Sequence, residues 1–307
     1  MRIAVVGAGA MGCLFGGKLA CAAEVWLYDP WREHVEAIRR DGLRIVEPTG
    51  ENTVFLPATT DPAEIGQVDL GIIFVKSHQT EWAASIARGL LKPNGLALTL
   101  QNGLGNGEVI ARVLGPERAW QGVTSHGATL LGPGRVRHAG TGPTHLELRE
   151  DIAEQAEEVA RTFQQAELET HLSSDLDSLI WGKLVINVGI NALTAILRVP
   201  NGTLAEVPAG KALMDAAIAE AVAVCTAKGI KLPYEDAAKR CAEVAIATGA
   251  NRSSMLQDVL RANRTEVDVI NGAVVREAAK LGLRVPVNEV LTGLLKAVEA
   301  TYSIRIQ

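Results

Sequence analysis

The sequence lacks the features that mark several classes of protein. Its Lys and Arg residues are scattered without a dense basic run, and the formal net charge is −5. This argues against nucleic-acid binding and against docking on an anionic membrane. The four cysteines lie in apolar stretches and form no CxxC or Cys/His cluster. We therefore expect reduced thiols, a cytoplasmic location and no metal site.

We also expect neither a membrane span nor a leader segment. No apolar run reaches the roughly 18 residues of a membrane span, and the chain opens directly on a strand pattern rather than a signal peptide. The 307 residues are 48% hydrophobic, which is enough for a sizeable core and favours two domains. These totals predict a soluble protein that acts on small molecules.

The most unusual stretch that is present covers residues 176–196, LDSLIWGKLVINVGINALTAI. Lys183, Asn187 and Asn191 are spaced four apart, so they share one face of a helix that is otherwise apolar. An unpaired amide or ammonium in apolar surroundings costs about 2–7 kcal/mol, so this polar face needs partners. A structural network and a small, oxygen-rich ligand both satisfy that need.

The amino-terminal residues carry a dinucleotide-binding fingerprint. Residues 2–6 are typical of a buried strand, and a helical pattern begins at Cys13. Between them stand Gly7, Ala8, Gly9, Ala10, Met11 and Gly12. The glycines permit a tight turn, close approach of backbone to a pyrophosphate, and close helix packing, while the helix N-terminus attracts phosphates. This order of strand, glycines and helix predicts a bound dinucleotide.

The second strand, residues 24–28, ends at Asp29. The fingerprint places an acid at this point to accept hydrogen bonds from the adenosine ribose. Such an acid favours NADH, because it repels the 2′-phosphate of NADPH, although Arg32 is close enough to offer the opposite preference. A plain turn before Pro30 is the alternative explanation of Asp29.

Further strands are predicted at residues 70–75 and 96–100, with a helix at 81–91 between them, which indicates a parallel, doubly wound sheet. Lys76 and Asn102 follow these strands at the edge where ligands bind. For Asn102 a simple Asn-Gly turn is the alternative. Residues 122–148 predict added antiparallel strands, and we interpret His126 within them as structural.

After a boundary near residues 173 and 174 the pattern is helical, with helices predicted at 176–196, 210–228, 234–248, 254–262, 265–281 and 288–302. Ser254 and Gln257 have the spacing of a capping box, and Glu266 is expected at the start of the next helix, where the helix dipole favours an acid. Ser254 is also a candidate ligand of a carboxylate.

Taken together, six motifs closely resemble the ketopantoate reductase family from Met1 to about Tyr302. They are GAGAMG, QNGLG, WGKLxxNxxxN, PNG, and NRSSMLQD followed by RTEVDxING. The resemblance implies an α/β plus all-α fold. A Rossmann dinucleotide-binding domain of residues 1–173 would be followed by a helical, 6-phosphogluconate-dehydrogenase-like substrate domain of residues 174–307.

The resemblance also implies a reaction and a role for each matched residue. The family reduces 2-dehydropantoate to (R)-pantoate with NADPH or NADH, in pantothenate and coenzyme A biosynthesis. Lys183 matches the general acid and Glu266 the glutamate that assists it. The substrate ligands match Asn187, Asn191, Asn251 and Ser254. Asn102 matches a residue near the nicotinamide, and Lys76 a cofactor-side lysine. Family members occur as monomers or homodimers.

One departure from the family concerns the coenzyme. Members usually carry an arginine shortly after the second strand to bind the 2′-phosphate, whereas here the strand ends in Leu27-Tyr28-Asp29-Pro30. This favours NADH modestly. An alternative function is therefore NADH-dependent reduction of another branched 2-oxo acid, or the reverse oxidation of an (R)-2-hydroxy acid. A non-catalytic dinucleotide sensor is a second alternative, against which Lys183 and Glu266 argue.

Overall fold

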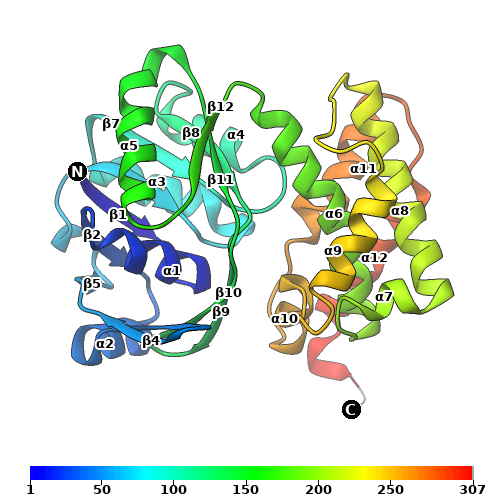
Figure 1. Ribbon diagram of the computed structural model, residues 1–307, viewed down its shortest axis with the longest axis horizontal. Helices are drawn as coiled ribbons and strands as arrows, with labels where there is room; N and C mark the ends of the chain where they lie inside the picture. The colour runs from blue at the N-terminus through cyan, green and yellow to red at the C-terminus, as the bar shows by residue number, and fades with distance from the viewer. Residues whose placement is uncertain (306–307) are drawn as a thin grey trace. The chain divides into compact units, whose positions relative to one another are not determined.

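The computed structural model describes residues 1–305 and divides into two compact units (Figure 1). The first, called here the sheet unit, comprises Met1–Gln101 and Asn106–Leu176. The second, the helical unit, comprises Asn102–Gly105 and Asp177–Gln307. The short segment Asn102–Gly105 thus belongs by its contacts to the helical unit, although the chain on either side of it lies in the sheet unit.

The sheet unit contains an eight-stranded sheet in the order β12-β11-β8-β7-β6-β1-β2-β5. Its strands are β1 (Arg2–Val6), β2 (Glu24–Tyr28), β5 (Ala58–Thr59), β6 (Val68–Ile73), β7 (Leu91–Thr99), β8 (Ala119–Thr124), β11 (Thr144–Glu147) and β12 (Thr170–Ser173). All pairs are parallel except β8 with β11. The predicted doubly wound parallel sheet is confirmed.

Helices cover both faces of this sheet. They are α1 (Ala10–Leu19), α2 (Arg32–Asp41), α3 (Thr80–Leu90), α4 (Asn106–Leu114) and α5 (Ala153–Gln165). Successive residues of a strand point to opposite faces. Ile3 and Val5 of β1 accordingly join the core cluster with α1 and α5, whereas Ala4 and Val6 join the cluster with α3 and α4. Because both faces of β1 are buried, its four residues from Ile3 to Val6 are all apolar, and only Arg2 at its start is charged.

A second, four-stranded sheet was not expected from the sequence. It has the order β4-β3-β10-β9 and consists of β3 (Leu43–Glu47), β4 (Gly50–Val54), β9 (Gly127–Gly132) and β10 (Arg135–Gly140). The prediction that residues 122–148 add antiparallel strands to the main sheet is correct only for β11. The prediction is wrong for β9 and β10, because β10 pairs with β3, far away in the sequence.

The helical unit is built around α6 (Leu176–Leu197), as the sequence predicts. The helices that follow are α7 (Thr203–Glu206), α8 (Pro208–Ala227), α9 (Ala237–Ala247), α10 (Ser254–Leu260), α11 (Asn271–Lys280) and α12 (Pro286–Ala300). The single helix predicted at 265–281 is wrong in one respect. A 3-10 turn, η4 (Val267–Val269), precedes α11, and Glu266 is the residue before that turn.

Helix α6 is long and apolar enough to cross a membrane by length and composition alone, contrary to the expectation of no span-length segment. Two-thirds of its most apolar window, 67%, is buried inside the protein. Among its buried residues are Leu184, Val185 and Val188, which are each at most 1% exposed. In this structure α6 is the central core helix of the helical unit.

Candidate active site

The turn between β1 and α1 has room only for glycine at two positions. Gly7 has a φ of +97°, and a Cβ there would lie 2.8 Å from the backbone nitrogen of Val75. A Cβ on Gly12 would lie 1.9 Å from the carbonyl oxygen of Gly7. A Cβ on Gly9, in contrast, would meet nothing within 4 Å, so the surface above it is open. This cradle fits the pyrophosphate of a dinucleotide.

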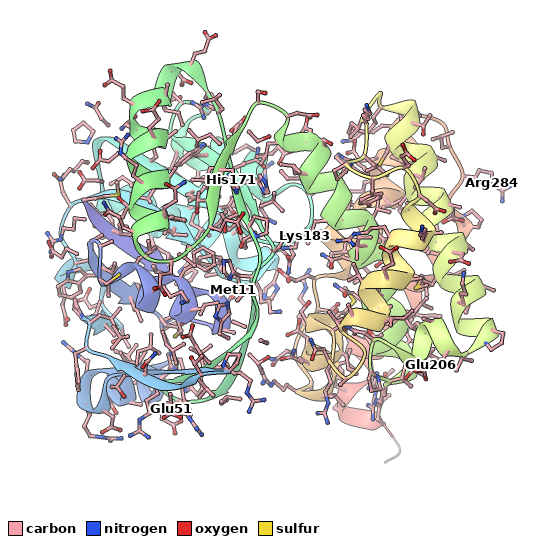
Figure 2. The ribbon with its side chains drawn as sticks, in the orientation of Figure 1. Met11, Glu51, His171, Lys183, Glu206 and Arg284 are labelled. Carbon is pink, nitrogen blue, oxygen red and sulfur yellow. The ribbon has the colours of Figure 1, made fainter. Side chains whose placement is uncertain are left out.

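The middle residues of the fingerprint connect this cradle to the helix. Ala8 is buried, and Ala10 and Met11 are the first two residues of α1, from which the Met11 side chain extends (Figure 2). Because these positions lead into a helix, their backbone N–H groups are among those that a helix leaves without an internal partner.

The carboxylate of Asp29 ties the cradle to the end of β2. Its Oδ2 accepts a hydrogen bond from the backbone N–H of Ala8 at 2.9 Å, and its Oδ1 accepts one from the N–H of Trp31 at 2.9 Å. Each carboxylate oxygen can accept more than one bond, so a ribose hydroxyl can still be held. The turn explanation and the ribose explanation of Asp29 are therefore compatible. Arg32, the first residue of α2, is exposed.

The ends of β6 and β7 are joined by Gln101. Its Nε2 donates to the carbonyl oxygen of Val75 at 2.6 Å and to the hydroxyl of Thr80 at 3.0 Å. Lys76 follows Val75 and is partly buried. The Gln101 side chain therefore links Gln101 to Val75 at the carboxyl edge of the sheet. The two predicted residues come directly after this linked pair: Lys76 follows Val75, and Asn102 follows Gln101.

The segment Asn102–Gly105 is attached to η4 in the helical unit. The N–H of Leu104 donates to the carbonyl oxygen of Val269 at 2.9 Å. Gly103 has a φ of +84°, and a Cβ there would lie 2.4 Å from the same oxygen. The chain bends at Asn102 and Gly103, and the glycine is required by this close approach.

Within the helical unit, Lys183, Asn187 and Asn191 lie on one face of α6, at successive steps of four residues. Lys183 and Asn187 are partly buried, and Asn191 is 6% exposed. Figure 2 shows Lys183 extending from this helix. The polar face predicted from the spacing is thus present and half-buried.

Lys183 has an unusual electrostatic environment. Burial lowers the pKa of its ammonium group from 10.5 to about 8, and the charge of Glu266 opposes that shift. Glu266 comes from the segment before η4 and is 7% exposed. An amine with a pKa near neutrality, held beside a carboxylate, can both donate and accept a proton under physiological conditions.

The start of α10 differs from the sequence-based expectation by one residue. The N-cap is Ser253, whose Oγ accepts a hydrogen bond from the N–H of Leu256 at 3.0 Å. The capping box of Ser254 with Gln257 is therefore wrong. Ser254 is exposed, and Gln257 instead donates to the carbonyl oxygen of Arg252 at 3.1 Å. Since the Ser254 hydroxyl does not cap the helix, helix capping does not explain the presence of a serine at this position.

Asn251 is exposed, and its backbone is braced by the Pro-Asn-Gly turn. The N–H of Asn201 donates to the carbonyl oxygen of Asn251 at 3.0 Å, and the Asn201 side chain donates to the hydroxyl of Thr248 at 2.9 Å. The Pro-Asn-Gly motif thus holds the segment that carries Asn251 and Ser254.

Two further residues connect this segment to α6. The hydroxyls of Thr194 and Ser253 are hydrogen bonded at 2.8 Å, and Thr194 is fully buried. Sequence reasoning missed both residues. The only available signal was position, since Thr194 lies one turn beyond Asn191 and Ser253 lies next to Ser254.

His126 belongs to a chain of hydrogen bonds in the sheet unit. Its Nδ1 lies 3.0 Å from Nε2 of His138, whose Nδ1 lies 3.2 Å from Oε1 of Glu47. Lys18 pairs with the same oxygen at 3.0 Å. Burial, assisted by His138, lowers the pKa of His126 to about 4. His126 is therefore neutral near pH 7, which agrees with its interpretation as structural.

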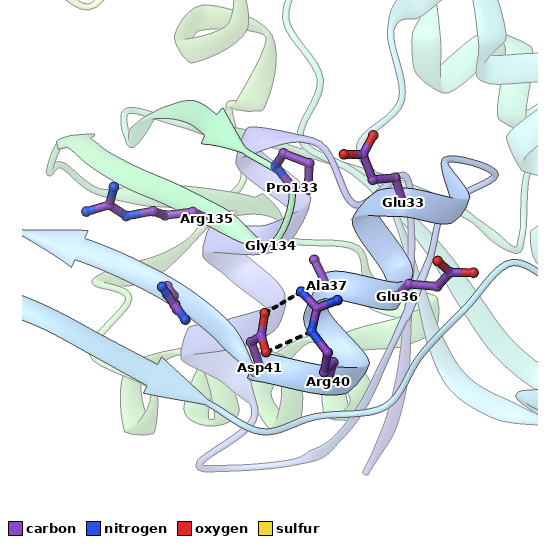
Figure 3. A pocket seen from close by; sticks show the side chains of 10 residues that line it. Glu33, Glu36, Ala37, Arg40, Asp41, Pro133, Gly134 and Arg135 are labelled. Atoms are coloured by element: carbon purple, nitrogen blue, oxygen red, sulfur yellow. Dashed lines mark hydrogen bonds and ion pairs between the residues drawn. The ribbon is translucent and has the colours of Figure 1, made fainter.

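A surface cavity of about 280 Å³ lies beside α2 and the turn before β10 (Figure 3). Its charged side chains include Arg40 and Asp41, which form a bidentate pair with distances of 2.7 and 3.0 Å. The lining contains none of the predicted site residues. Among residues 1–305 no group of three or more His, Cys, Asp or Glu side chains is arranged to hold a metal ion.

Comparison with known proteins identifies relatives along the whole chain. Residues 3–151 match the family model "Ketopantoate reductase PanE/ApbA", and residues 175–299 match its C-terminal counterpart. The chain is 39% identical to the 2-dehydropantoate 2-reductase of Halobacterium salinarum over 299 residues, which covers 96% of this chain and 98% of the relative. The corresponding protein of Pyrococcus abyssi is 36% identical, with 98% of each chain covered.

Two solved structures are similar in both fold and sequence. The ketopantoate reductase of the PanE/ApbA family from Ralstonia eutropha has a TM-score of 0.90 at 35% identity, covering 98% of this chain and 99% of that one. A D-mandelate dehydrogenase in a ternary structure with NADH and anilino(oxo)acetate has a TM-score of 0.91 at 32% identity, with the same coverage.

Proposed function

The chain belongs to the ketopantoate reductase family, and on that premise we propose that it is a 2-dehydropantoate 2-reductase. In this reaction NAD(P)H reduces the keto group of 2-dehydropantoate to give (R)-pantoate, a precursor of coenzyme A. The observation that carries the assignment is Lys183, whose pKa of about 8 and position on the polar face of α6 suit a general acid.

The bound nicotinamide coenzyme supplies the hydride for the keto carbon. Lys183 would donate the proton to the keto oxygen, so that a C–H and an O–H bond form while the C=O π bond and one N–H bond of the ammonium group break. Glu266 raises the pKa of Lys183 against the effect of burial and so maintains the ammonium form near pH 8. The ammonium group also stabilises the negative charge that develops on the oxygen before the proton moves.

The substrate's carboxylate and hydroxyl groups are assigned to four further side chains: Asn187, Asn191, Asn251 and Ser254. The amides of α6 extend from the same helix face as Lys183. The exposed hydroxyl of Ser254 is free of the capping role, and its segment is fixed to α6 through Ser253 and Thr194. Groups built to pair a substrate hydroxyl discriminate strongly against analogues that lack it.

Coenzyme binding is assigned mainly to the sheet unit, with Asn102 contributed by the segment that belongs to the helical unit. The Gly7, Gly9 and Gly12 cradle holds the pyrophosphate, and Asp29 holds the adenosine ribose. Lys76 and Asn102 are assigned to the nicotinamide side. Since the Asp29 carboxylate repels a 2′-phosphate, NADH is the favoured coenzyme and Arg32 is the residue that would permit NADPH.

We assign coenzyme binding to residues 1–173 and substrate binding to residues 174–307. Asn102 is the exception to a split by compact unit, because its segment belongs to the helical unit by its contacts. The cysteines Cys13, Cys21, Cys225 and Cys241 are all free thiols, which supports a reducing, cytoplasmic environment.

The test is the loss of nicotinamide absorbance with purified protein and 2-dehydropantoate, run in parallel with NADH and NADPH. 2-Oxoisovalerate, which lacks the hydroxymethyl group, is the comparison substrate. We expect fast oxidation of coenzyme with 2-dehydropantoate and slow oxidation with 2-oxoisovalerate. Equal rates on the two acids would contradict the assignment of pantoate specificity to the Asn and Ser side chains.

A second candidate is an NADH-dependent dehydrogenase of another (R)-2-hydroxy acid. Two observations favour it. The Asp29 carboxylate lies at the end of β2, against the glycine turn, where it opposes a 2′-phosphate. The D-mandelate dehydrogenase structure that holds NADH is similar to 98% of this chain. It predicts rapid NAD⁺ reduction with D-mandelate and none with pantoate, measured at the same nicotinamide band.

A further inference from the structure

Asn271, the first residue of α11, is completely buried but has no role in the function proposed above. It belongs to the RTEVDxING motif, five residues after Glu266. Its Oδ1 is buried without a hydrogen-bond partner, whereas its Nδ2 donates two hydrogen bonds. Burying an amide costs free energy that its hydrogen bonds offset only in part here, so the contacts of Nδ2 indicate what this residue holds in place.

On one side Asn271 contacts the helix that carries Lys183. Its Nδ2 donates to the carbonyl oxygen of Val188 at 3.2 Å. Val188 is next to Asn187 on α6 and lies just over one turn beyond Lys183. This bond therefore connects the beginning of α11 to the stretch of α6 that presents the polar face.

On the other side Asn271 is anchored through Asn288. Nδ2 of Asn271 also donates to Oδ1 of Asn288 at 3.0 Å, and Asn288 donates to Oε2 of Glu220 at 2.8 Å and to the carbonyl oxygen of Ala217 at 3.1 Å. Glu220 also accepts hydrogen bonds from the N–H groups of Val287 and Asn288, at 2.8 and 2.9 Å. The amide of Asn271 is thus fixed to α8 and to the start of α12.

A short, hydrogen-bonded turn connects Asn271 to Glu266. The N–H of Val269 donates to the carbonyl oxygen of Glu266 at 3.1 Å, and the N–H of Ile270 donates to that of Val267 at 3.3 Å. These bonds form η4 and leave little freedom between the two side chains. Whatever fixes Asn271 against α6 therefore also fixes Glu266 against α6.

We propose that Asn271 is a positioning residue that sets the distance between Lys183 and Glu266. This proposal rests on the function proposed above for that pair. Without its bond to Val188, η4 and α11 can shift along α6 while the helices remain folded. The attraction between the Glu266 carboxylate and the Lys183 ammonium weakens as their separation grows.

The test compares Asn271→Leu and the double variant Asn271→Leu/Asn288→Leu with the unaltered chain. The double variant replaces both partners with apolar groups of similar size, so it removes the link without leaving an unpaired amide. Ser178→Ala is the matched control, because Ser178 anchors the same helix by donating to the carbonyl oxygen of Lys231 at 2.6 Å, before Lys183 in the chain.

The first measurement is independent of turnover. The rate at which an amine-acylating reagent modifies Lys183, followed by mass spectrometry across pH, gives the pKa of that group. We expect a value near 8 in the unaltered chain and in Ser178→Ala, and a lower value in both Asn271 variants, because Glu266 raises this pKa. An unchanged Lys183 pKa in the double variant would overturn the proposal.

The second measurement is the pH dependence of kcat. Misplacement of a catalytic group by about 1 Å costs about 100-fold in rate, so we expect the Asn271 variants to lose about 10- to 100-fold in kcat with unchanged KM for the coenzyme. Lower thermal stability with an unaltered pH profile would also overturn the proposal. Full activity in Lys183→Ala, by contrast, would contradict the function assigned to Lys183 itself.

Discussion

The hydroxyls of Thr194 and Ser253 lie 2.8 Å apart, and this hydrogen bond links helix α6 to the segment that presents Asn251 and Ser254. Thr194 is fully buried, and Ser253 caps α10 at the same time. The position of the proposed substrate ligands therefore depends on a residue that does not itself contact substrate in the proposal.

Replacing Thr194 by valine removes this hydroxyl at nearly constant volume. We expect a loss of about 0.5–1.5 kcal/mol in the free energy of unfolding and a rise of about 3- to 10-fold in KM for the 2-oxo acid. Coenzyme KM should not change. Thr226→Val, which removes a hydroxyl bonded only to the carbonyl of Val222 on α8, is the control for KM. Steady-state kinetics and urea unfolding give both quantities, and an identical KM in the two variants would count against this role for Thr194.

Lys183→Ala should lower kcat by about 100- to 10,000-fold, the usual contribution of general acid catalysis. Coenzyme affinity, measured by fluorescence titration, should stay the same. Lys211→Ala, which removes a lysine from a surface ion pair with Asp215, controls for loss of a charge in the helical unit. Turnover close to that of the unaltered chain would show that another group supplies the proton.

The rate of reduction should fall as pH rises through about 8, because the proposed proton transfer needs the ammonium form of Lys183. Oxidation in the reverse direction needs the free amine, so its rate should fall as pH drops through the same value. Since Glu266 raises the pKa of Lys183, Glu266→Gln should move both limbs to lower pH. The pH–rate profiles of reduction and of oxidation measure the direction of this shift. A shift to higher pH in Glu266→Gln would contradict the interaction of Glu266 with Lys183.

Asp29→Asn should change coenzyme preference with little change in volume. It removes the charge that opposes a 2′-phosphate, so the ratio of kcat/KM with NADPH to that with NADH should rise by about tenfold or more. Glu33→Gln neutralises an exposed acid nearby on α2 and should leave the ratio unaltered. Arg32→Ala should weaken NADPH selectively if this side chain binds the phosphate. A constant ratio in Asp29→Asn would exclude Asp29 as the selecting residue.

Gly12→Ala should disrupt the dinucleotide cradle, because its Cβ would lie 1.9 Å from the carbonyl oxygen of Gly7. We expect a loss of about 3 kcal/mol or more in the free energy of unfolding, together with loss of coenzyme binding. Gly89→Ala is the control, since a Cβ at this exposed helical position would meet nothing within 4 Å. It should stabilise the protein by about 0.5–1 kcal/mol. Thermal unfolding without NADH measures the loss of stability, and the additional stabilisation when NADH is present measures coenzyme binding.

The local parts of the fold were predictable because short-range patterns determine them. The glycine turn, β1, β2 and α6 follow from apolar periodicity and from steric limits within a few residues of one another. The four-stranded sheet was not predictable, because the pairing of β10 with β3 joins segments that are distant in the sequence and carry no local signal for one another.

In the candidate site, too, the features that local geometry determines were predictable and those that depend on other parts of the chain were not. The spacing of Lys183, Asn187 and Asn191 predicts their common face, since helix geometry alone decides it. The choice between Ser253 and Ser254 as N-cap depends on the backbone angles of one residue, which neighbouring serines do not reveal. The break before α11 has a similar cause, because η4 is held by Leu104 of a different part of the chain, through Val269.

The composition of α6 has a consequence during synthesis of the protein. The helix emerges from the ribosome before α8, α11 and α12, which bury it in the finished chain, so for that interval a span-length apolar segment is exposed. A lysine at the centre of a membrane segment opposes insertion by about 2.5–3.5 kcal/mol. The polar face assigned to catalysis therefore also lowers the chance that the translocation machinery inserts this nascent helix into a bilayer.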